Sequence, residues 1–160
     1  MTRYECSLEN GKVPAKVGTI LVPVDLSDAS VAILQWAVDL ATVQGARVDA
    51  LHVIDLPSYT SMAHLPAEGL DGPTLVEEAH LQATKKLRRL VKEATREGVH
   101  VRGIVESGDV LEHIVRDARG YDLVVIGNHR SGLTEIFFGN TADKVAGRVD
   151  TPVVGVRVSG

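Results

Sequence analysis

A glycine-rich loop between residues 127 and 141 has the residue types of an anion-binding site. It follows the apolar run LVVI and leads into a helical pattern. Glycine allows positive φ angles and a close approach of the backbone to a ligand. The glycines of the loop are Gly127, Gly132 and Gly139. Asn140 and Thr141 stand where the helical pattern begins, and free N–H groups at a helix start favour negative charge. The loop therefore predicts a site for a phosphate chain.

The loop does not match the common phosphate-binding motifs. GNHRSGLT has the glycine spacing of a P-loop, but Leu133 occupies the position of the lysine and the loop follows the wrong strand. No GxGxxG follows the first predicted strand. His129 has no nucleophile or second base near it in sequence, and the other histidines lack metal-ligand spacing such as HExxH. We therefore predict neither a catalytic residue nor a metal site.

The elements that must position this loop alternate along the chain. Short apolar runs predict five strands, at 19–24, 47–54, 99–106, 121–127 and 152–158. Apolar residues at helical spacing predict helices at about 27–43, 74–97, 109–119 and 141–149. Strands as apolar as LVVI occur where helices cover both faces of a parallel sheet, so we predict one doubly wound, three-layer α/β/α domain. Ligands of such folds bind beyond the carboxyl ends of the strands, where the strand order reverses.

Local signals place the ends of these elements. Ser27 and Asp28 offer capping oxygens to the first helix, and Asp109 and Glu112 have the spacing of a capping box. The connection at 55–73 contains three prolines and shows neither the helical nor the strand hydrophobic period. A connection this long in a compact domain tends to be functional or mobile. These signals predict where the loops lie. Asp25, at the end of the first strand, could orient a turn as readily as contact a ligand.

Composition limits the classes of function. A chain of 160 residues with 44% hydrophobic residues fits one domain, and we predict a flexible tail at 1–16 and the domain at 17–160. A net charge of −4 argues against a nucleic-acid partner, and the basic run at 85–92 alternates with apolar residues as a solvated helix face does. The one cysteine, Cys6, excludes an intramolecular disulfide. No run is long and apolar enough for a membrane partner, and we predict a cytoplasmic protein.

Five segments taken in order resemble the universal stress protein family. They are ILVPVDLSDAS, LHVID, LVVIGNHRSGL, GNTADKV and TPVVGVRV, between about residues 17 and 158. The resemblance implies a five-stranded parallel sheet of order 3-2-1-4-5, of the adenine-nucleotide alpha-hydrolase-like kind. It also implies ATP as ligand, with Mg2+ as a possible companion, a homodimer formed through the last strand at 152–158, and an unknown protein partner.

The resemblance assigns binding roles to individual residues. The residues implied to contact adenine and ribose are Pro23, Val24, Asp25 and Val53. Those implied to lie along the ribose and the phosphates are Ile126, Gly127, Gly139, Asn140 and Thr141. His129, Arg130 and Gly132 belong to the same loop and complete the candidate set.

The sequence departs from the pattern G-x2-G-x9-G-(S/T) of the ATP-binding branch at two places. Arg130 stands where the second glycine is expected, in a loop that is one residue short, and Asn140 replaces serine or threonine. Asparagine caps a helix as well as serine does, so the second change is mild. Arg130 can either contact phosphate oxygens or fill the space that a nucleotide needs. The resemblance to members with an SHRxGL loop, which implies ATP binding, favours the first role.

Three functions remain as alternatives at this point. The favoured one is a nucleotide-dependent regulator of the stress response with at most slow ATP hydrolysis, because no arginine finger or Walker-type acid is visible. ATP would then order the loop at 127–139 and the segment at 55–73. The second is a dimeric interaction module of the same family that binds no nucleotide. The third, a nucleotidyl transferase or ATP pyrophosphatase, lacks its HxGH or SGGxDS signature.

Overall fold

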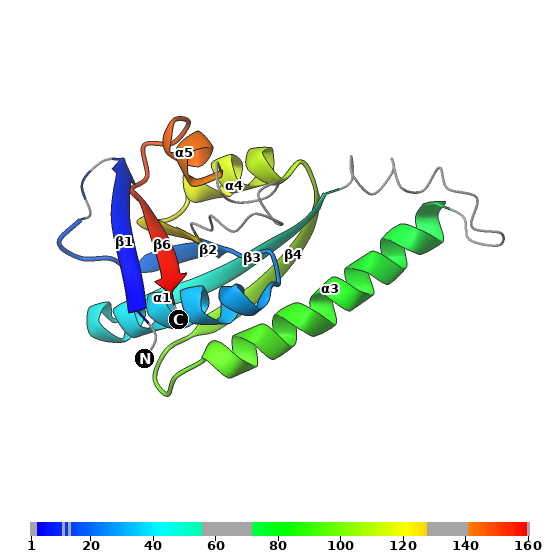
Figure 1. Cartoon of the computed structure of the whole chain (residues 1–160), viewed down its shortest axis with the longest axis horizontal. Coiled ribbons are helices and arrows are strands. Elements are labelled where there is room, and N and C mark those ends of the chain that lie inside the picture. Colours follow the sequence, from blue (N-terminus) through cyan, green and yellow to red (C-terminus); the bar gives the residue numbers. More distant parts are fainter. Residues whose placement is uncertain (1–2, 11, 13, 56–71, 128–140, 160) are drawn as a thin grey trace.

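The computed structural model describes residues 3–10, 12, 14–55, 72–127 and 141–159. Among these residues, six strands form one sheet in the order β1-β6-β5-β2-β3-β4 (Figure 1). The strands are β1 (Arg3–Asn10), β2 (Thr19–Pro23), β3 (Arg47–Asp55), β4 (Val101–Gly108), β5 (Leu123–Gly127) and β6 (Val153–Ser159). The helices are α1 (Asp28–Gln44), α3 (Gly72–Ala94), α4 (Val110–Ala118) and α5 (Thr141–Ala146).

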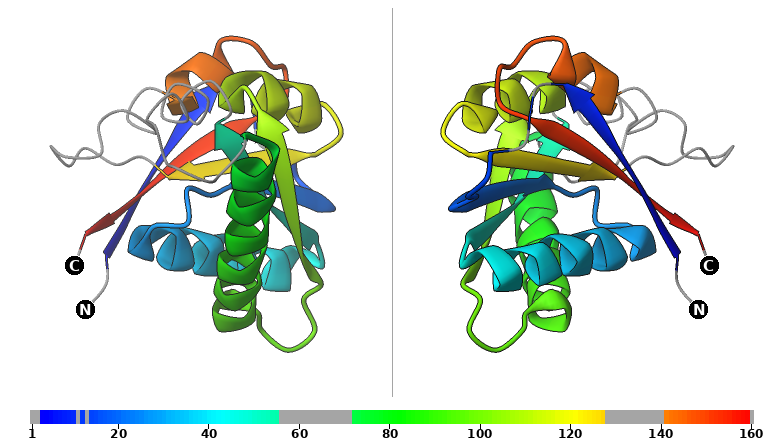
Figure 2. Two further views of the ribbon diagram at one scale, coloured as in Figure 1. Left: turned by 90° about the vertical axis from the view of Figure 1, so that its right-hand side faces the viewer. Right: turned by 90° about the vertical axis from the view of Figure 1, so that its left-hand side faces the viewer.

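The strands β2 to β6 are parallel and confirm the predicted order 3-2-1-4-5. Helices α1 and α3 cover one face of the sheet, and α4 and α5 cover the other (Figure 2). In β3, Val48 and Ala50 pack under α1 and α3, whereas Leu51 and Val53 pack under α4 and α5. Alternate residues of a strand point to opposite faces, so a strand covered on both faces is apolar throughout. The three-layer α/β/α fold class is confirmed.

The N-terminal segment differs from the flexible tail that the sequence predicted at 1–16. Residues 3–10 form β1, which pairs with β6 in antiparallel fashion, with Cys6 opposite Val156. The signal that could have predicted this strand is an alternation of apolar and polar residues, because Tyr4, Cys6 and Leu8 alternate with polar residues. The purely parallel five-stranded sheet is therefore corrected to a mixed sheet of six strands in the part of the chain that the structure describes.

This pairing also affects the predicted dimer. Strand β6 lies between β5 and β1, so both of its edges are hydrogen-bonded within one chain. A second copy cannot pair with the strand at 152–158 while β1 stays in place. The prediction of a dimer through that free edge is therefore wrong for this arrangement of the chain.

Two helix ends follow their local signals, and two differ from them. Gly45, with a φ of 68°, follows the last residue of α1, close to the helix end that the sequence predicted at about residue 43. The Asp109 carboxylate accepts a hydrogen bond of 2.9 Å from the Glu112 backbone N–H, which confirms the cap of α4. Ser27 is the N-cap residue of α1, but its side chain makes no capping hydrogen bond. Helix α3 begins at Gly72, so its first residues belong to the segment predicted as a connection.

None of the helices that the structure describes combines the length and the apolarity needed to cross a membrane.

Candidate functional site

The strand order reverses between β2 and β5. From β2 the chain proceeds to β3 and β4 on one side of the sheet, whereas β5 and β6 lie on the other side. In folds of this class, neighbouring crossovers leave such a point in opposite directions, and ligands bind beyond the carboxyl ends of the two strands. The candidate site therefore lies at the carboxyl ends of β2 and β5.

The structure brings the described candidate residues to this edge of the sheet. Pro23 is the last residue of β2, Gly127 is the last residue of β5, and Thr141 begins α5. The side chains of Val53 and Ile126 are buried in the cluster under α4 and α5. These two side chains are therefore part of the core.

The other candidates of the loop lie outside the described residues. They are His129, Arg130, Gly132, Gly139 and Asn140.

The turn after β2 is held by hydrogen bonds from both directions. The Val24 backbone N–H donates to the Leu51 carbonyl at 2.8 Å. The Asp25 Oδ1 atom accepts from the Ser27 backbone N–H at 2.9 Å and from the Ser30 hydroxyl at 2.7 Å. Leu26 has a φ of 62°, an unusual angle for a residue with a Cβ atom. Asp25 therefore orients this turn, which was one of the two roles that the sequence left open for it.

Ser30, which packs against this turn, was missed by the sequence analysis. Ser30 is a buried polar residue in an otherwise apolar helix face, and it is 2% exposed. Its hydroxyl reaches Asp25 because one helical turn brings it back over the end of β2. The Ser27 hydroxyl is also buried, and no partner for it is found among the described residues. A serine inside an apolar helical stripe is the signal that marks such a contact.

His52 was the second residue that the sequence analysis missed. Its Nδ1 atom lies 2.9 Å from the Val24 carbonyl oxygen. Burial lowers the pKa of His52, although the Val24 carbonyl and the charge of Asp25 act in the opposite direction. A polar residue in line with Val48 and Ala50 on the covered face of β3 is the signal that could have identified it.

A groove of 310 Å³ opens beside this turn, on the side of α3. Leu26 and Ile54 supply apolar surface, and Asp25, His52 and Lys86 supply polar groups. Because His52 and Ile54 point to the face opposite Val53, the groove adjoins the candidate site from the α1 and α3 side of the sheet. The arrangement can accept a ligand that is partly apolar and carries hydrogen-bonding groups.

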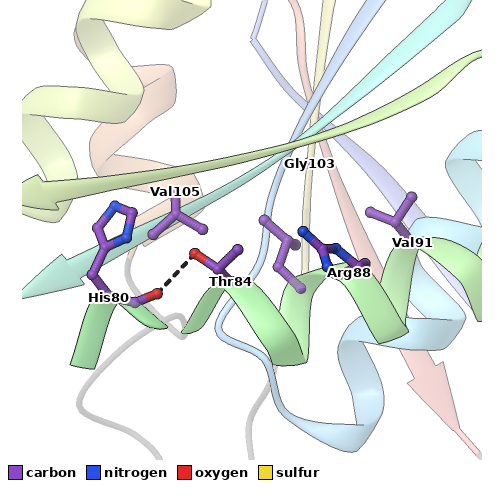
Figure 3. A pocket seen from close by; sticks show the side chains of 7 residues that line it. His80, Thr84, Arg88, Val91, Gly103 and Val105 are labelled. Carbon is purple, nitrogen blue, oxygen red and sulfur yellow. Dashed lines mark hydrogen bonds between the residues drawn. The ribbon is translucent and has the colours of Figure 1, made fainter. Parts of the chain in front are cut away.

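A second groove, of 280 Å³, lies between α3 and β4 (Figure 3). His80, Thr84 and Arg88 line it together with apolar residues of both elements. The Thr84 hydroxyl donates to the His80 carbonyl at 2.8 Å, so that hydroxyl already has a partner within the helix. No candidate residue lies in this groove, which is two strands away from the reversal of strand order.

Potential metal ligands do not gather in the part of the chain that the structure describes. No group of three or more histidine, cysteine, aspartate or glutamate side chains there could hold a metal ion.

Known proteins share both the sequence and the fold of this chain. The model of the Universal stress protein family matches residues 16–157. The chain is 31% identical over 146 residues to the universal stress protein YxiE of Bacillus subtilis, a match that covers 86% of this chain and 97% of YxiE. The solved structure of the universal stress protein UspA from Lactobacillus plantarum is similar with a TM-score of 0.68 and 25% identity, over 90% of this chain and 100% of that chain.

Two further structures of similar fold are described with a nucleotide. A universal stress protein from Archaeoglobus fulgidus in complex with dAMP has a TM-score of 0.58 and 23% identity, over 87% of this chain and 97% of that chain. A universal stress protein in complex with cAMP has a TM-score of 0.60 and 20% identity, over 88% of this chain and 97% of that chain. The family match spans the predicted strands, the turn after β2 and the loop after β5, and the chain therefore belongs to the universal stress protein family.

Proposed function

We propose that this protein binds an adenine nucleotide, ATP in the first place, and acts as a nucleotide-dependent regulator in the stress response. One observation carries the proposal. The turn after β2 and the end of β5 meet at the reversal of strand order, which is where doubly wound folds bind nucleotides. The dAMP and cAMP complexes of proteins with this fold support an adenine nucleotide as ligand.

The adenine and ribose side of the proposed site is the turn at residues 23–25. Val24 and Asp25 leave the sheet at the end of β2, and the backbone of Val53 lies on the neighbouring strand. The Asp25 carboxylate is partly exposed, so it can accept a hydrogen bond from a ligand on the side away from Ser30.

The phosphate side of the proposed site runs from Gly127 to Thr141. These residues close β5 and begin α5. Between them the sequence supplies Arg130, a cation that can bind phosphate oxygens through two N–H groups, and Gly139 and Asn140 next to the helix start. Mg2+ would accompany ATP as the ion of the phosphates.

The test is a calorimetric titration of the nucleotide-stripped protein with Mg-ATP, with GTP as the competing nucleotide. We expect saturable binding of ATP and much weaker binding of GTP. Asp25→Asn keeps the oxygen that holds Ser27 and Ser30 but removes the charge, and we expect it to weaken ATP binding roughly tenfold. Asp28→Asn is the matched control, because Asp28 is exposed in the first turn of α1, and it should leave the affinity unchanged.

Arg130→Gln tests the phosphate side. Loss of a charge-assisted contact should weaken ATP binding by roughly ten- to a hundredfold and AMP binding by less. Absence of both heat and thermal stabilisation at millimolar ATP would overturn the proposal, because a ligand at 100 times its Kd adds about 2.7 kcal/mol to stability. The protein would then be an interaction module that works without a nucleotide.

A further inference from the structure

We propose that His52 is a positioning residue of the nucleotide site. It holds the Val24 carbonyl group and so fixes the turn that presents Val24 and Asp25 to the adenine. The inference rests on the proposed function, because it assigns a task within that same site. His52 itself lies one strand away from the turn, on β3.

The contact defines which ring nitrogen carries the proton. Nδ1 lies 2.9 Å from the Val24 carbonyl oxygen, and a carbonyl oxygen can only accept a hydrogen bond. Nδ1 must therefore carry a hydrogen in either charge state of the ring. The neutral ring then has its acceptor at Nε2, and the bond to Val24 does not depend on protonation.

His52 continues the pairing of β2 and β3 beyond the end of the backbone ladder. The register between the two strands ends with Pro23 opposite Leu51. One residue later, the Val24 N–H still reaches the Leu51 carbonyl, but the Val24 carbonyl accepts from the His52 side chain. Consecutive residues of β3 therefore hold both backbone groups of Val24. A side chain takes over where the backbone of β2 leaves the sheet.

The turn needs this support because its next residues are conformationally costly. Leu26 has a φ of 62°, an angle that is unfavourable for a residue with a Cβ atom. Asp25, through Ser27 and Ser30, holds the turn from the side of α1. His52 holds it from the side of β3, so the turn is fixed between two elements before any ligand arrives.

The surroundings of His52 are consistent with a neutral ring that acts through its hydrogen bond. Asp25 faces it from the turn, and Glu78 and Lys86 line the same groove from α3. Burial lowers the pKa of the ring, and the positive charge of Lys86 acts in the same direction.

The test compares a variant that keeps the donor with one that removes it. The side-chain N–H of asparagine can take the place of Nδ1–H, so His52→Asn should keep the bond to Val24, whereas His52→Leu cannot form it. We expect His52→Leu to weaken the binding of AMP, ADP and ATP by the same factor, roughly three- to tenfold. In His52→Asn, the three affinities should lie within about twofold of the wild-type values. His100→Leu, at an exposed position before β4, is the control and should change none of them.

An equal loss for the three nucleotides is the distinguishing readout. A defect in folding would lower the titrated stoichiometry and the Tm instead of the affinity of the folded fraction. Wild-type affinity in His52→Leu, a failed rescue by His52→Asn, or a loss that grows with the number of phosphates would each overturn the positioning role.

Hydrogen exchange separates this inference from the proposed function. In the ligand-free protein, the Ser27 amide is bonded to Asp25 and the Val24 amide to Leu51. We expect both amides to exchange faster in His52→Leu but not in His52→Asn. If wild-type protein binds no nucleotide while this exchange pattern holds, the proposed function fails and His52 holds the turn for another purpose. If it binds ATP and the exchange is unchanged, the positioning role alone fails.

Discussion

At the scale of single residues, several side chains have structural tasks that also shape the candidate site. Asp25 accepts two hydrogen bonds from the first turn of α1 and still lines the groove next to it. Ser30 interrupts the apolar face of its helix, and its hydroxyl donates a hydrogen bond to that carboxylate. Both residues therefore stabilise the turn whether or not a nucleotide is bound.

Gly108 is a residue whose replacement should be damaging for a reason of backbone geometry. It has a φ of 145°, and a Cβ atom there would lie 2.6 Å from Nε2 of His113. We expect Gly108→Ala to lower the free energy of unfolding by about 1–3 kcal/mol, because backbone strain and overlap add. Urea denaturation measures the difference. A change within about 0.5 kcal/mol would contradict it.

Gly120 offers the matched control. A Cβ atom added at Gly120 would lie 3.5 Å from the Asp117 carbonyl oxygen, which is an ordinary van der Waals contact. Gly120→Ala should therefore change the unfolding free energy by no more than about 0.5 kcal/mol.

At the scale of elements, β1 decides what the edge of the sheet offers to other molecules. It covers β6 along its length, from Arg3 opposite Ser159 to Asn10 opposite Val153. An uncovered edge strand presents unpaired backbone groups that pair readily with another chain. In this fold the chain itself supplies that strand.

Deletion of residues 1–11 should expose the edge of β6 and promote self-association. We expect the shortened protein to form dimers through β6 or to aggregate in a concentration-dependent way, whereas the full chain does not associate through this edge. Sedimentation equilibrium of both proteins measures the difference. Ser7→Pro, which weakens β1 in the full-length chain, should shift association in the same direction. A shortened protein that stays monomeric at all concentrations would show that β1 is not what prevents association through the edge of β6.

At the scale of the whole molecule, acid should lower stability in two stages. Burial lowers the pKa of His52 below its ordinary value of 6.5. As the pH falls, the His52 ring is therefore protonated at a higher pH in the unfolded chain than in the folded protein. Stability from His52 is therefore complete above that value and is lost as the pH falls below it. The carboxylates follow at lower pH: the Gly18 and Thr19 N–H groups lower the pKa of Asp122, so its contribution is present above the ordinary value of 3.8 and is lost on further acidification.

Urea denaturation at several pH values between about 8 and 3 tests this order. We expect His52→Asn to abolish the first decline, because asparagine does not titrate, and to leave the second decline in place. A first decline of equal size in the variant would assign it to another group.

The buried cluster around Asp49 shows how such contributions depend on distant parts of the chain. Asp49 is 1% exposed, and it accepts hydrogen bonds from Arg102 at 2.7 Å and from the Tyr121 hydroxyl at 2.6 Å. Burial alone would raise the pKa of Asp49, but these two hydrogen bonds and the charges of Arg102 and Arg47 together outweigh it, so the pKa is lowered. Arg102 lies on β4 and Tyr121 lies in the turn before β5, so the sequence around Asp49 does not predict these two partners.

The sequence by itself determined the alternation of strands and helices, whereas the order of the parallel strands was implied by the resemblance to the universal stress protein family. Hydrophobic period and helix caps are local, and right-handed crossovers leave few ways to arrange such elements. It also placed Pro23, Asp25 and Gly127 at one edge of the sheet, because the carboxyl ends of parallel strands meet there.

Only the tertiary structure decided which groups meet. The pairing of β1 with β6 joins the two ends of the chain, and the contact of His52 with Val24 joins residues that are 28 positions apart. Long-range contacts of this kind depend on register and on the twist of the sheet, which single residues and their neighbours in sequence do not specify. For the same reason, the sequence left the role of Asp25 open until the fold placed Ser27 and Ser30 against it.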